Sequence, residues 1–254
     1  MNVVIIGTGN VATVFGRLFK KAGFTIKEVF GRSLPKASAL AEELGTLACT
    51  EWAHIAKDAD IYLLAITDTA LYHVDKLLVL KHQLVLHTAG SVSKDVLKNI
   101  SLNYGVLYPL QSLRKELPVR AAIPLLIDAN NDSLIETVKE IASRLSPSVT
   151  VADDNTRLRL HMAAIFINNF TNHLYIITED LCKKEGVDFK LLLPLATETA
   201  TRLEWLSPSQ VATGPAIRKD EITINKHLDL LKGYPHIQKL YRLMTESIWE
   251  VNDG

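Results

Sequence analysis

The feature that most restricts the fold is a glycine-rich turn close to the N-terminus. The apolar residues Val3 to Ile6 lead into the string Gly7-Thr8-Gly9-Asn10-Val11-Ala12. This spacing matches the pattern G-x-G-x-x-G/A, in which glycines make a tight turn and let backbone N–H groups approach a pyrophosphate closely. Apolar residues then recur at helical spacing until Gly23, which predicts a strand, a glycine turn and a helix in succession. The alternative is a structural turn in a protein that binds another ligand.

Apolar runs typical of buried strands alternate with helical segments through the first part of the chain. Strands are expected at 24–30, 46–49, 60–66, 83–87, 104–108, 123–129 and 148–153, and helices at 34–44 and 132–145. Runs of this length, separated by helices, belong to a parallel sheet covered on both faces. From Asn155 onward the chain carries no convincing strand. We therefore predict an α/β Rossmann-type, doubly wound, mostly parallel sheet at residues 1–152, followed by an all-α domain at 153–254 for substrate binding and dimerisation.

Composition excludes several classes of partner. Lys plus Arg and Asp plus Glu both number 28, so the chain lacks the basic excess of a nucleic-acid-binding protein. Cys49 and Cys182 have no CxxC partner and no metal-ligand spacing, which favours a reducing compartment and no metal site. No apolar run reaches the ~18 residues that span a bilayer, and the first one lacks the basic flank of a signal peptide. We expect a soluble, cytoplasmic protein with a small-molecule ligand and no membrane or nucleic-acid partner.

The residues after the second strand indicate which dinucleotide fits the turn. An NAD site places a carboxylate there for the ribose hydroxyls, whereas an NADP site places Arg and hydroxyl donors near the 2′-phosphate. Here the strand runs into Gly31, Arg32 and Ser33, and Glu28 lies inside the strand, so we discount it as a ribose ligand. Arg32 offers a planar fork for phosphate; its alternative role is that of a solvated surface residue. The sequence favours NADP over NAD.

Two further strand ends are expected to line the cofactor, because ligands of open α/β sheets bind beyond the carboxyl ends of the strands. The candidate cofactor-binding residues are Gly7, Thr8, Gly9, Asn10, Val11, Ala12, Arg32, Ser33, Ile66, Thr67, Asp68, His87, Thr88 and Ala89. Asp68 could instead cap the helix that follows it. His87 could instead be a histidine whose hydrogen bonds are satisfied by loop backbone.

A mostly apolar helix, expected from about Asn155 to Leu181, carries the first candidate catalytic residues. At ~100° per residue, His161, Asn168 and Asn172 share one stripe of such a helix. Polar residues in so apolar a helix need partners. The stripe either faces the nicotinamide cleft or forms a buried polar seam that fixes how the two domains pack.

The string TGPAIRKD, residues 213–220, supplies the last candidate. Gly214-Pro215 makes a rigid bend, and Arg218 follows just before a helix that Asp220 could cap. An arginine beside a helix N-terminus suits a carboxylate. We expect Arg218 to hold an anionic end of the substrate; the alternative is a surface arginine beside a capped helix.

Several strings resemble known families. The series IIGTGNVA, FGRS, DIYLLAITD and VLHTAGS is similar to the cofactor domains of pyrroline-5-carboxylate reductases and β-hydroxyacid dehydrogenases. HTAGS, LYPLQSL, HMAAIFINNF and TGPAIRKDEITINKHLDLL resemble more closely the bacterial NADP oxidoreductases that join a Rossmann-like domain to a helical C-terminal domain of unassigned function. Many members have His-Pro where this chain has Tyr108-Pro109, and Gly where it has Lys219. Some members look like an alternative class of ketopantoate reductase.

The resemblance implies an NADPH-dependent reductase of a small ketoacid, aldehyde or imine. Related dehydrogenases use a Lys followed four residues later by Asn on the helix after the sheet, and this chain lacks that pair. Two alignments are open: one places Ile165 at the Lys position, and the other places His161 there, where a histidine could act as an acid. Ketopantoate reduction and an NADP-binding protein without turnover remain the alternatives. Apolar segments such as 191–200 in the helical domain predict a homodimer.

Overall fold

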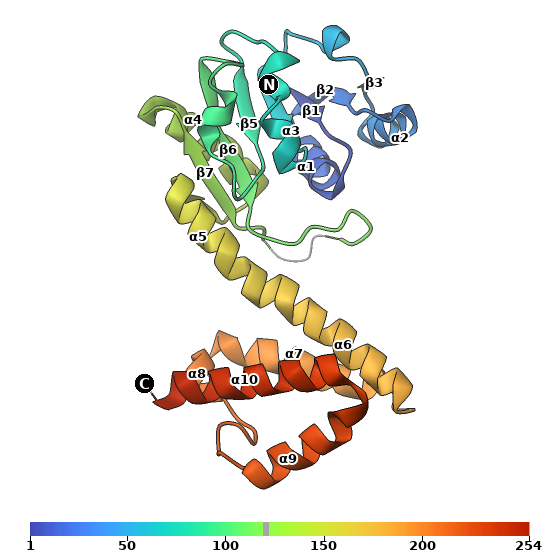
Figure 1. Cartoon of the computed structure of the whole chain (residues 1–254). Coiled ribbons are helices and arrows are strands. Elements are labelled where there is room, and N and C mark those ends of the chain that lie inside the picture. The colour runs from blue at the N-terminus through green and yellow to red at the C-terminus, as the bar shows by residue number, and fades with distance from the viewer. Residues whose placement is uncertain (119–121, 254) are drawn as a thin grey trace. The chain divides into compact units, whose positions relative to one another are not determined.

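The computed structural model describes residues 1–118 and 122–253. The chain forms two compact units, Met1–Phe170 and Thr171–Gly254. The first holds the sheet and the second is helical (Figure 1). The domain boundary between residues 152 and 153 stays a prediction, because the compact units divide later in the sequence, at 170/171.

One eight-stranded sheet organises the first unit, in the order β3-β2-β1-β4-β5-β6-β7-β8. The strands are β1 (Asn2–Ile6), β2 (Thr25–Phe30), β3 (Leu47–Cys49), β4 (Ile61–Leu64), β5 (Leu84–His87), β6 (Asn103–Pro109), β7 (Leu125–Ala129) and β8 (Val149–Val151). All neighbours are parallel except β6 and β7. The direction of winding reverses between β1 and β4, which places the carboxyl end of β1 at the point where such sheets bind ligands. The predicted fold class is confirmed.

Helices cover both faces of this sheet (Figure 1). They are α1 (Asn10–Lys21), α2 (Leu34–Leu44), α3 (Asp68–Leu71) and α4 (Asp132–Leu145), with short 3₁₀ segments at Trp52–His54, Val74–Lys76 and Lys94–Leu97. Helix α5 (Asp154–Ala164) follows β8 in the chain. On one face, α1, α2 and α4 bury a cluster that includes Ile5, Phe15 and Phe19. The other face buries Ile6 and Tyr62 under α3 and the two later 3₁₀ segments. Each large side chain fully buried in this way contributes roughly 1.5–3 kcal/mol.

The turn that ends α1 shows how the sequence sets an element's length. Gly23 has φ +79°, a left-handed conformation that glycine adopts without steric cost. Its N–H donates to the carbonyl of Lys20, and Phe24 N–H donates to the carbonyl of Phe19. These bonds satisfy the last carbonyls of the helix and turn the chain into β2.

The second unit consists of five helices among the residues described. They are α6 (Thr171–Lys184), α7 (Leu193–Thr201), α8 (Pro208–Val211), α9 (Glu221–Leu230) and α10 (Pro235–Asp253), with 3₁₀ segments at Phe189–Leu192, Arg202–Glu204 and Leu231–Gly233. Few of its described side chains are buried: Ile224, Leu228, Leu231 and Thr245. Within the described chain, no helix has the length and apolar character needed to cross a membrane.

The expectation of one regular α-helix from Asn155 to Leu181 is wrong between Ile165 and Phe170. These six residues form a π-helix, with α5 before it and α6 after it. A π-helix bonds i to i+5 instead of i to i+4, so each residue advances by a smaller angle. The angle between His161 and Asn168 therefore differs from the one expected for a regular α-helix, and the shared stripe of His161, Asn168 and Asn172 stays a prediction.

Candidate cofactor and active site

The glycine turn joins β1 to α1 and is shaped for close approach of a ligand. Gly7 has φ +130°, and a Cβ at this position would collide with the carbonyl oxygen of Ala65. Gly9 has an ordinary φ of −83°, and a Cβ there would meet no protein atom within 4 Å. Protein packing explains a glycine at position 7 but not at position 9. The space that Gly9 leaves open lies at the N-terminus of α1, where free backbone N–H groups favour an anion.

A cavity of about 600 Å³ opens over this turn, within the first unit. Its wall brings together most of the predicted cofactor-binding residues: Gly7, Thr8, Gly9, Asn10, Val11, Arg32, Ile66, Thr67, Asp68, Thr88 and Ala89. Ala12, Ser33 and His87 are not among the lining residues. Ala12 is fully buried beneath the turn, and Ser33 is the first residue before α2. The residues present fit a dinucleotide, because the cavity combines a glycine turn, a helix N-terminus and an arginine.

Arg32 lines this cavity just after β2 and is exposed. Glu28 is not available as a ribose ligand, because its carboxylate accepts a hydrogen bond from Ala56 N–H at 2.9 Å. Trp52 also lines the cavity and packs against Phe30, with ring centroids 4.2 Å apart and the ring planes tilted by 41°. Trp52 could not be predicted as a site residue from the sequence, because it lies in a 3₁₀ segment that no strand or helix pattern marks.

The structure contradicts the alternative role considered for Asp68 and supports the one considered for His87. Asp68 does not cap the helix; Thr67 occupies the N-cap position of α3, and Asp68 accepts a hydrogen bond from the hydroxyl of Ser91 at 2.5 Å. The side chain of His87 is fully buried, and its Nδ1 accepts from Ala89 N–H at 3.1 Å. Burial, with the nearby charge of Arg157, lowers the pKa of His87 to about 3. His87 is therefore a neutral ring that shapes the loop after β5.

Tyr108, at the end of β6, lines the cavity although no sequence motif made it a candidate site residue. Its hydroxyl lies 3.0 Å from Nδ1 of His161 on α5, and both side chains line the cofactor cavity. Gly90 permits this contact, because a Cβ there would lie 2.7 Å from His161 Nδ1 and 2.9 Å from Tyr108 Cζ. Burial raises the pKa of Tyr108, an effect that the charge of Arg157 opposes. The hydroxyl is therefore protonated at neutral pH.

An ion pair between a buried arginine and a partly exposed aspartate fixes the start of α5, one turn before His161. The guanidinium of Arg157 is 1% exposed and donates from Nη2 to the carboxylate of Asp154 at 2.6 Å and to the carbonyl of Val92 at 2.5 Å. Asp154 also accepts from the hydroxyl of Ser93 and from Lys94 N–H. Burial acts to raise the pKa of Asp154, but the hydrogen bonds from Ser93 and Arg157 outweigh it and keep that pKa below its usual value. The network ties α5 to the loop after β5.

Asn168 lies in the π-helix and lines a second cavity of about 570 Å³, also within the first unit. Tyr108 and His161 line this cavity too. The structure thus brings His161 to the cofactor cavity and both His161 and Asn168 to the neighbouring one. Tyr108 and His161 are the two described residues that line both cavities.

Asn172 and Arg218 belong to the helical unit, and their roles stay predictions. Arg218 is exposed in the turn that follows Gly214. Trp249 Nε1 holds this turn by donating to the carbonyl of Ala216 at 2.9 Å. Asp220 does cap α9, because its carboxylate accepts from Thr223 N–H at 3.0 Å. Lys219 has φ +52°, a left-handed conformation that glycine adopts without steric cost, and many of the resembling sequences have glycine at this position.

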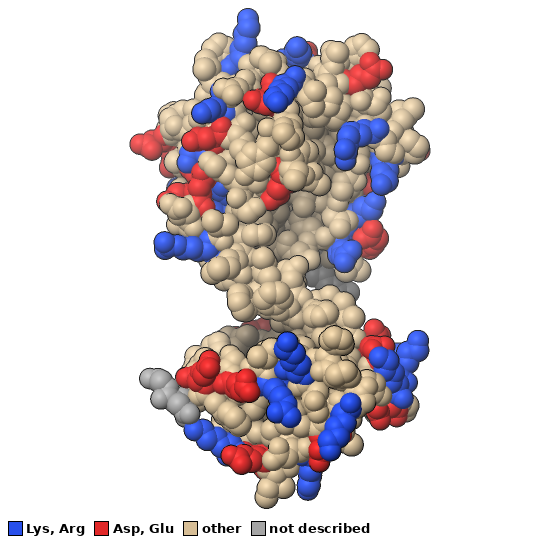
Figure 2. Space-filling view, in the orientation of Figure 1, with Lys and Arg blue, Asp and Glu red and all other residues tan. Residues whose placement is uncertain are grey.

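Charge is mixed over the surface that Figure 2 shows. Lys and Arg side chains lie among Asp and Glu side chains on this face, without a broad region of one sign. A face of this kind suits a small ligand bound in a cavity better than a polyanion bound along a surface.

Comparisons with known proteins agree with a dinucleotide-binding role for the cavity. Residues 2–90 match the family model "NADP oxidoreductase coenzyme F420-dependent", and residues 123–248 match a domain of unknown function, DUF2520. The crystal structure of "putative NADP oxidoreductase BF3122" from Bacteroides fragilis is 37% identical, with a TM-score of 0.92, and the match covers 98% of each chain. No curated protein matches the sequence.

More distant solved structures share the fold. The imine reductase from Myxococcus stipitatus in complex with NADP+ is 18% identical, with a TM-score of 0.67 over 100% of this chain and 95% of that one. A 1-pyrroline-5-carboxylate reductase from Streptococcus pyogenes is 17% identical, with a TM-score of 0.63 over 98% of each chain.

The fold and the cavity define a Rossmann-type oxidoreductase. At 37% identity over nearly the whole of both chains, the protein belongs to the family of NADP oxidoreductases that includes the Bacteroides fragilis protein. Its enzyme class and its cofactor, NADP, are those of the family.

Proposed function

We propose that this protein uses NADPH to reduce the carbonyl or imine of a small substrate. The observation that carries the proposal is the contact between Tyr108 and His161 at 3.0 Å, in the wall of the cavity that holds the glycine turn. A reductase of this kind needs a bound nicotinamide and a proton donor for the oxygen or nitrogen on which negative charge develops. Tyr108 and His161 supply such a donor.

The chain's own residues have distinct tasks in this proposal. The glycine turn and the N-terminus of α1 hold the pyrophosphate, and Arg32 holds the 2′-phosphate. NADPH supplies the hydride when bound. The hydroxyl of Tyr108 donates its proton to the substrate heteroatom, and His161 orients the hydroxyl and returns a proton to it. The ion pair of Arg157 and Asp154 holds α5, and with it His161, at the correct distance.

Arg218 is the reason for proposing that the substrate carries a carboxylate. A small carboxylate-bearing substrate, with ketopantoate as the named alternative, follows from the bend at Gly214-Pro215 and the guanidinium beside the start of α9. A guanidinium holds a carboxylate in one orientation, which hydride transfer requires.

The test is a panel of 2-ketoacids, including ketopantoate, with aldehydes and cyclic imines, incubated with the purified protein and NADPH. The loss of NADPH absorbance is followed, and products are identified by mass spectrometry. Reduction of a member of the panel supports the proposal. Tight NADPH binding without consumption by any member favours the second candidate, a binding protein without turnover, which the missing Lys–Asn pair supports.

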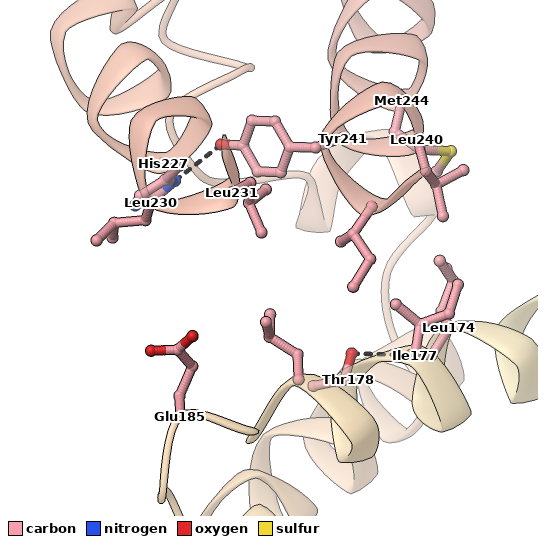
Figure 3. A pocket seen from close by; sticks show the side chains of 12 residues that line it. Leu174, Ile177, Thr178, Glu185, His227, Leu230, Leu231, Leu240, Tyr241 and Met244 are labelled. Carbon is pink, nitrogen blue, oxygen red and sulfur yellow. Dashed lines mark hydrogen bonds between the residues drawn. The ribbon is translucent and has the colours of Figure 1, made fainter. Parts of the chain in front are cut away.

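A homodimer is the second part of the proposal. In the helical unit, α6, α9 and α10 surround an apolar groove of about 480 Å³ (Figure 3). His227 and Tyr241 bridge two of the helices by a hydrogen bond of 2.8 Å, while Leu230 and Met244 stay exposed. A unit with so few buried side chains lacks the apolar core that stable folding requires. A second copy packed on these faces would supply it.

Light scattering after size-exclusion chromatography tests this proposal. We expect twice the mass of one 254-residue chain and a thermal transition that rises with protein concentration. A monomer whose thermal transition does not depend on concentration would contradict it.

A further inference from the structure

The second cavity, which Asn168 lines, lies next to the proposed proton donor. Its wall is formed by the segment that leaves β6, Tyr108 to Ser112, and by the end of α5 with the π-helix, Leu160 to Asn169. Tyr108 and His161 line both this cavity and the cofactor cavity. A substrate held here would have its reacting group beside the proton donor and beside the cofactor, which is the geometry that hydride transfer needs.

The wall carries no Asp, Glu, Lys or Arg among the lining residues described. Leu110, Leu160, Ile165 and Ile167 make it mostly apolar. A carboxylate bound here would find no Lys or Arg side chain to pair with, whereas an uncharged group needs none. The wall therefore disfavours a charged ligand.

Uncharged polar groups are present, and they can both donate and accept. The side chains of Gln111 and Ser112 form no hydrogen bond with another part of the described chain. Asn168 donates to Asn169 over a long 3.4 Å contact. Primary amides and a hydroxyl are matched by a ligand group that also donates and accepts, such as an amide or a hydroxyl.

The π-helix explains why three consecutive residues line the same cavity. Residues 167 to 169 are consecutive and all line the cavity. In a regular α-helix, three consecutive side chains fan out over about 200°. The wider π turn reduces that spread, and π turns of this kind are frequent at functional sites.

We propose that this second cavity binds the uncharged body of the substrate, an apolar chain or ring that carries an amide or hydroxyl group. The inference rests on the proposed function, because the proton donor in its wall is what makes the cavity a candidate substrate site. A carboxylate, if the substrate has one, lies outside this cavity. The cavity therefore selects against substrates whose only polar group near the reacting carbon is charged.

A matched pair of probes tests the proposal. Pentanamide and pentanoate have nearly the same size and shape but differ in charge, and ligand-observed NMR detects weak binding of both to the protein saturated with NADP+. We expect pentanamide to bind at least about tenfold more tightly than pentanoate. Equal or tighter binding of pentanoate, or no binding of either probe, would overturn the proposal.

Two arginine variants locate the binding site. Gln111→Arg places a cation in the wall, so we expect the preference to move toward pentanoate by about tenfold. Asn99→Arg adds the same charge at an exposed position outside both cavities and is expected to keep the wild-type preference. The same shift in both variants, or in neither, would show that the probes bind elsewhere.

The NADP+ affinity of each sample, measured first, separates this proposal from the proposed function. Loss of NADP+ binding contradicts the function. Intact NADP+ binding without a preference for pentanamide contradicts the assignment of the second cavity alone.

Discussion

The hydroxyl of Tyr108 and Nδ1 of His161 lie 3.0 Å apart, although 53 positions separate them in the sequence. Strand β6 and helix α5 bring them together beside Gly90, where a Cβ would collide with both side chains. The pair lines two cavities, so a proton it holds is within reach of a ligand in either one. The first prediction follows from this contact.

Tyr108→Phe and His161→Asn should each lower turnover by roughly 10²–10⁴-fold, the usual contribution of a positioned proton donor. NADPH affinity should change little, because neither side chain belongs to the glycine turn. Steady-state kinetics on a substrate from the panel, with NADPH titrations, measures both. Tyr104→Phe removes a hydroxyl from the same strand outside both cavities and serves as the control. Equal losses in all three variants would reject the catalytic assignment.

Arg32→Ala should weaken NADPH binding by about tenfold or more and leave NADH binding nearly unchanged. The reason is the loss of a charge-assisted contact of roughly 1.5–3 kcal/mol to the 2′-phosphate. Fluorescence titration with both cofactors measures the ratio. Lys36→Ala serves as the control, because it removes an exposed cation from α2 that does not line the cavity. Wild-type protein that binds NADH as tightly as NADPH would refute the assignment.

The two glycines of the turn should respond differently to alanine. Gly7→Ala forces φ +130° on a residue with a side chain and drives its Cβ into the carbonyl of Ala65, so we expect a loss of roughly 1–3 kcal/mol or more. Gly9→Ala should change stability by no more than about 1 kcal/mol but weaken NADPH binding strongly, because its Cβ occupies ligand space. Thermal melts and titrations separate the effects. A Gly9→Ala protein with wild-type NADPH affinity would contradict the placement of the pyrophosphate.

His87 should make stability depend on pH in a defined window. As the pH falls below about 6.5 the unfolded chain binds a proton at His87, but the folded chain does so only near its pKa of about 3. The free energy of unfolding should therefore fall by about 1.4 kcal/mol for each pH unit in this window. Asp154, whose pKa is lowered, adds a loss of the same sign below about pH 4, where an unfolded aspartate becomes protonated.

Urea unfolding from about pH 7 to about pH 4 measures this slope. His87→Asn keeps an acceptor for Ala89 N–H and removes the titrating group, so its curve should be flatter. The control is His82→Asn, which removes an exposed histidine and leaves His87 in place. A His87→Asn protein with the wild-type slope would show that another group is responsible.

Much of the fold could be predicted because its elements bury regular apolar patterns. The bounds of α2, Leu34–Leu44, and α4, Asp132–Leu145, agree with the prediction, since periodicity and end signals coincide there. The π-helix at Ile165–Phe170 could not be predicted, because a change of hydrogen-bond partner leaves no mark in composition. The π-helix changes the angle between successive side chains, yet His161 and Asn168 still line one cavity.

The candidate site was predictable where a motif carries it and not where the tertiary fold assembles it. Gly7 and Gly9 stand in a recognisable spacing. Tyr108 stands where resembling sequences have histidine, and only the packing of α5 against β6 gives it a partner. No sequence pattern marks Arg157, yet it is 1% exposed and paired with Asp154.

The most direct test of the central claim uses NADPH that carries deuterium at C4 of the nicotinamide, on the face that is transferred. With a substrate from the panel, the account predicts that deuterium appears on the carbon of the former carbonyl or imine. Tyr108→Phe should slow this transfer at unchanged cofactor affinity. Protein saturated with the labelled cofactor that transfers no deuterium to any member of the panel would contradict the account.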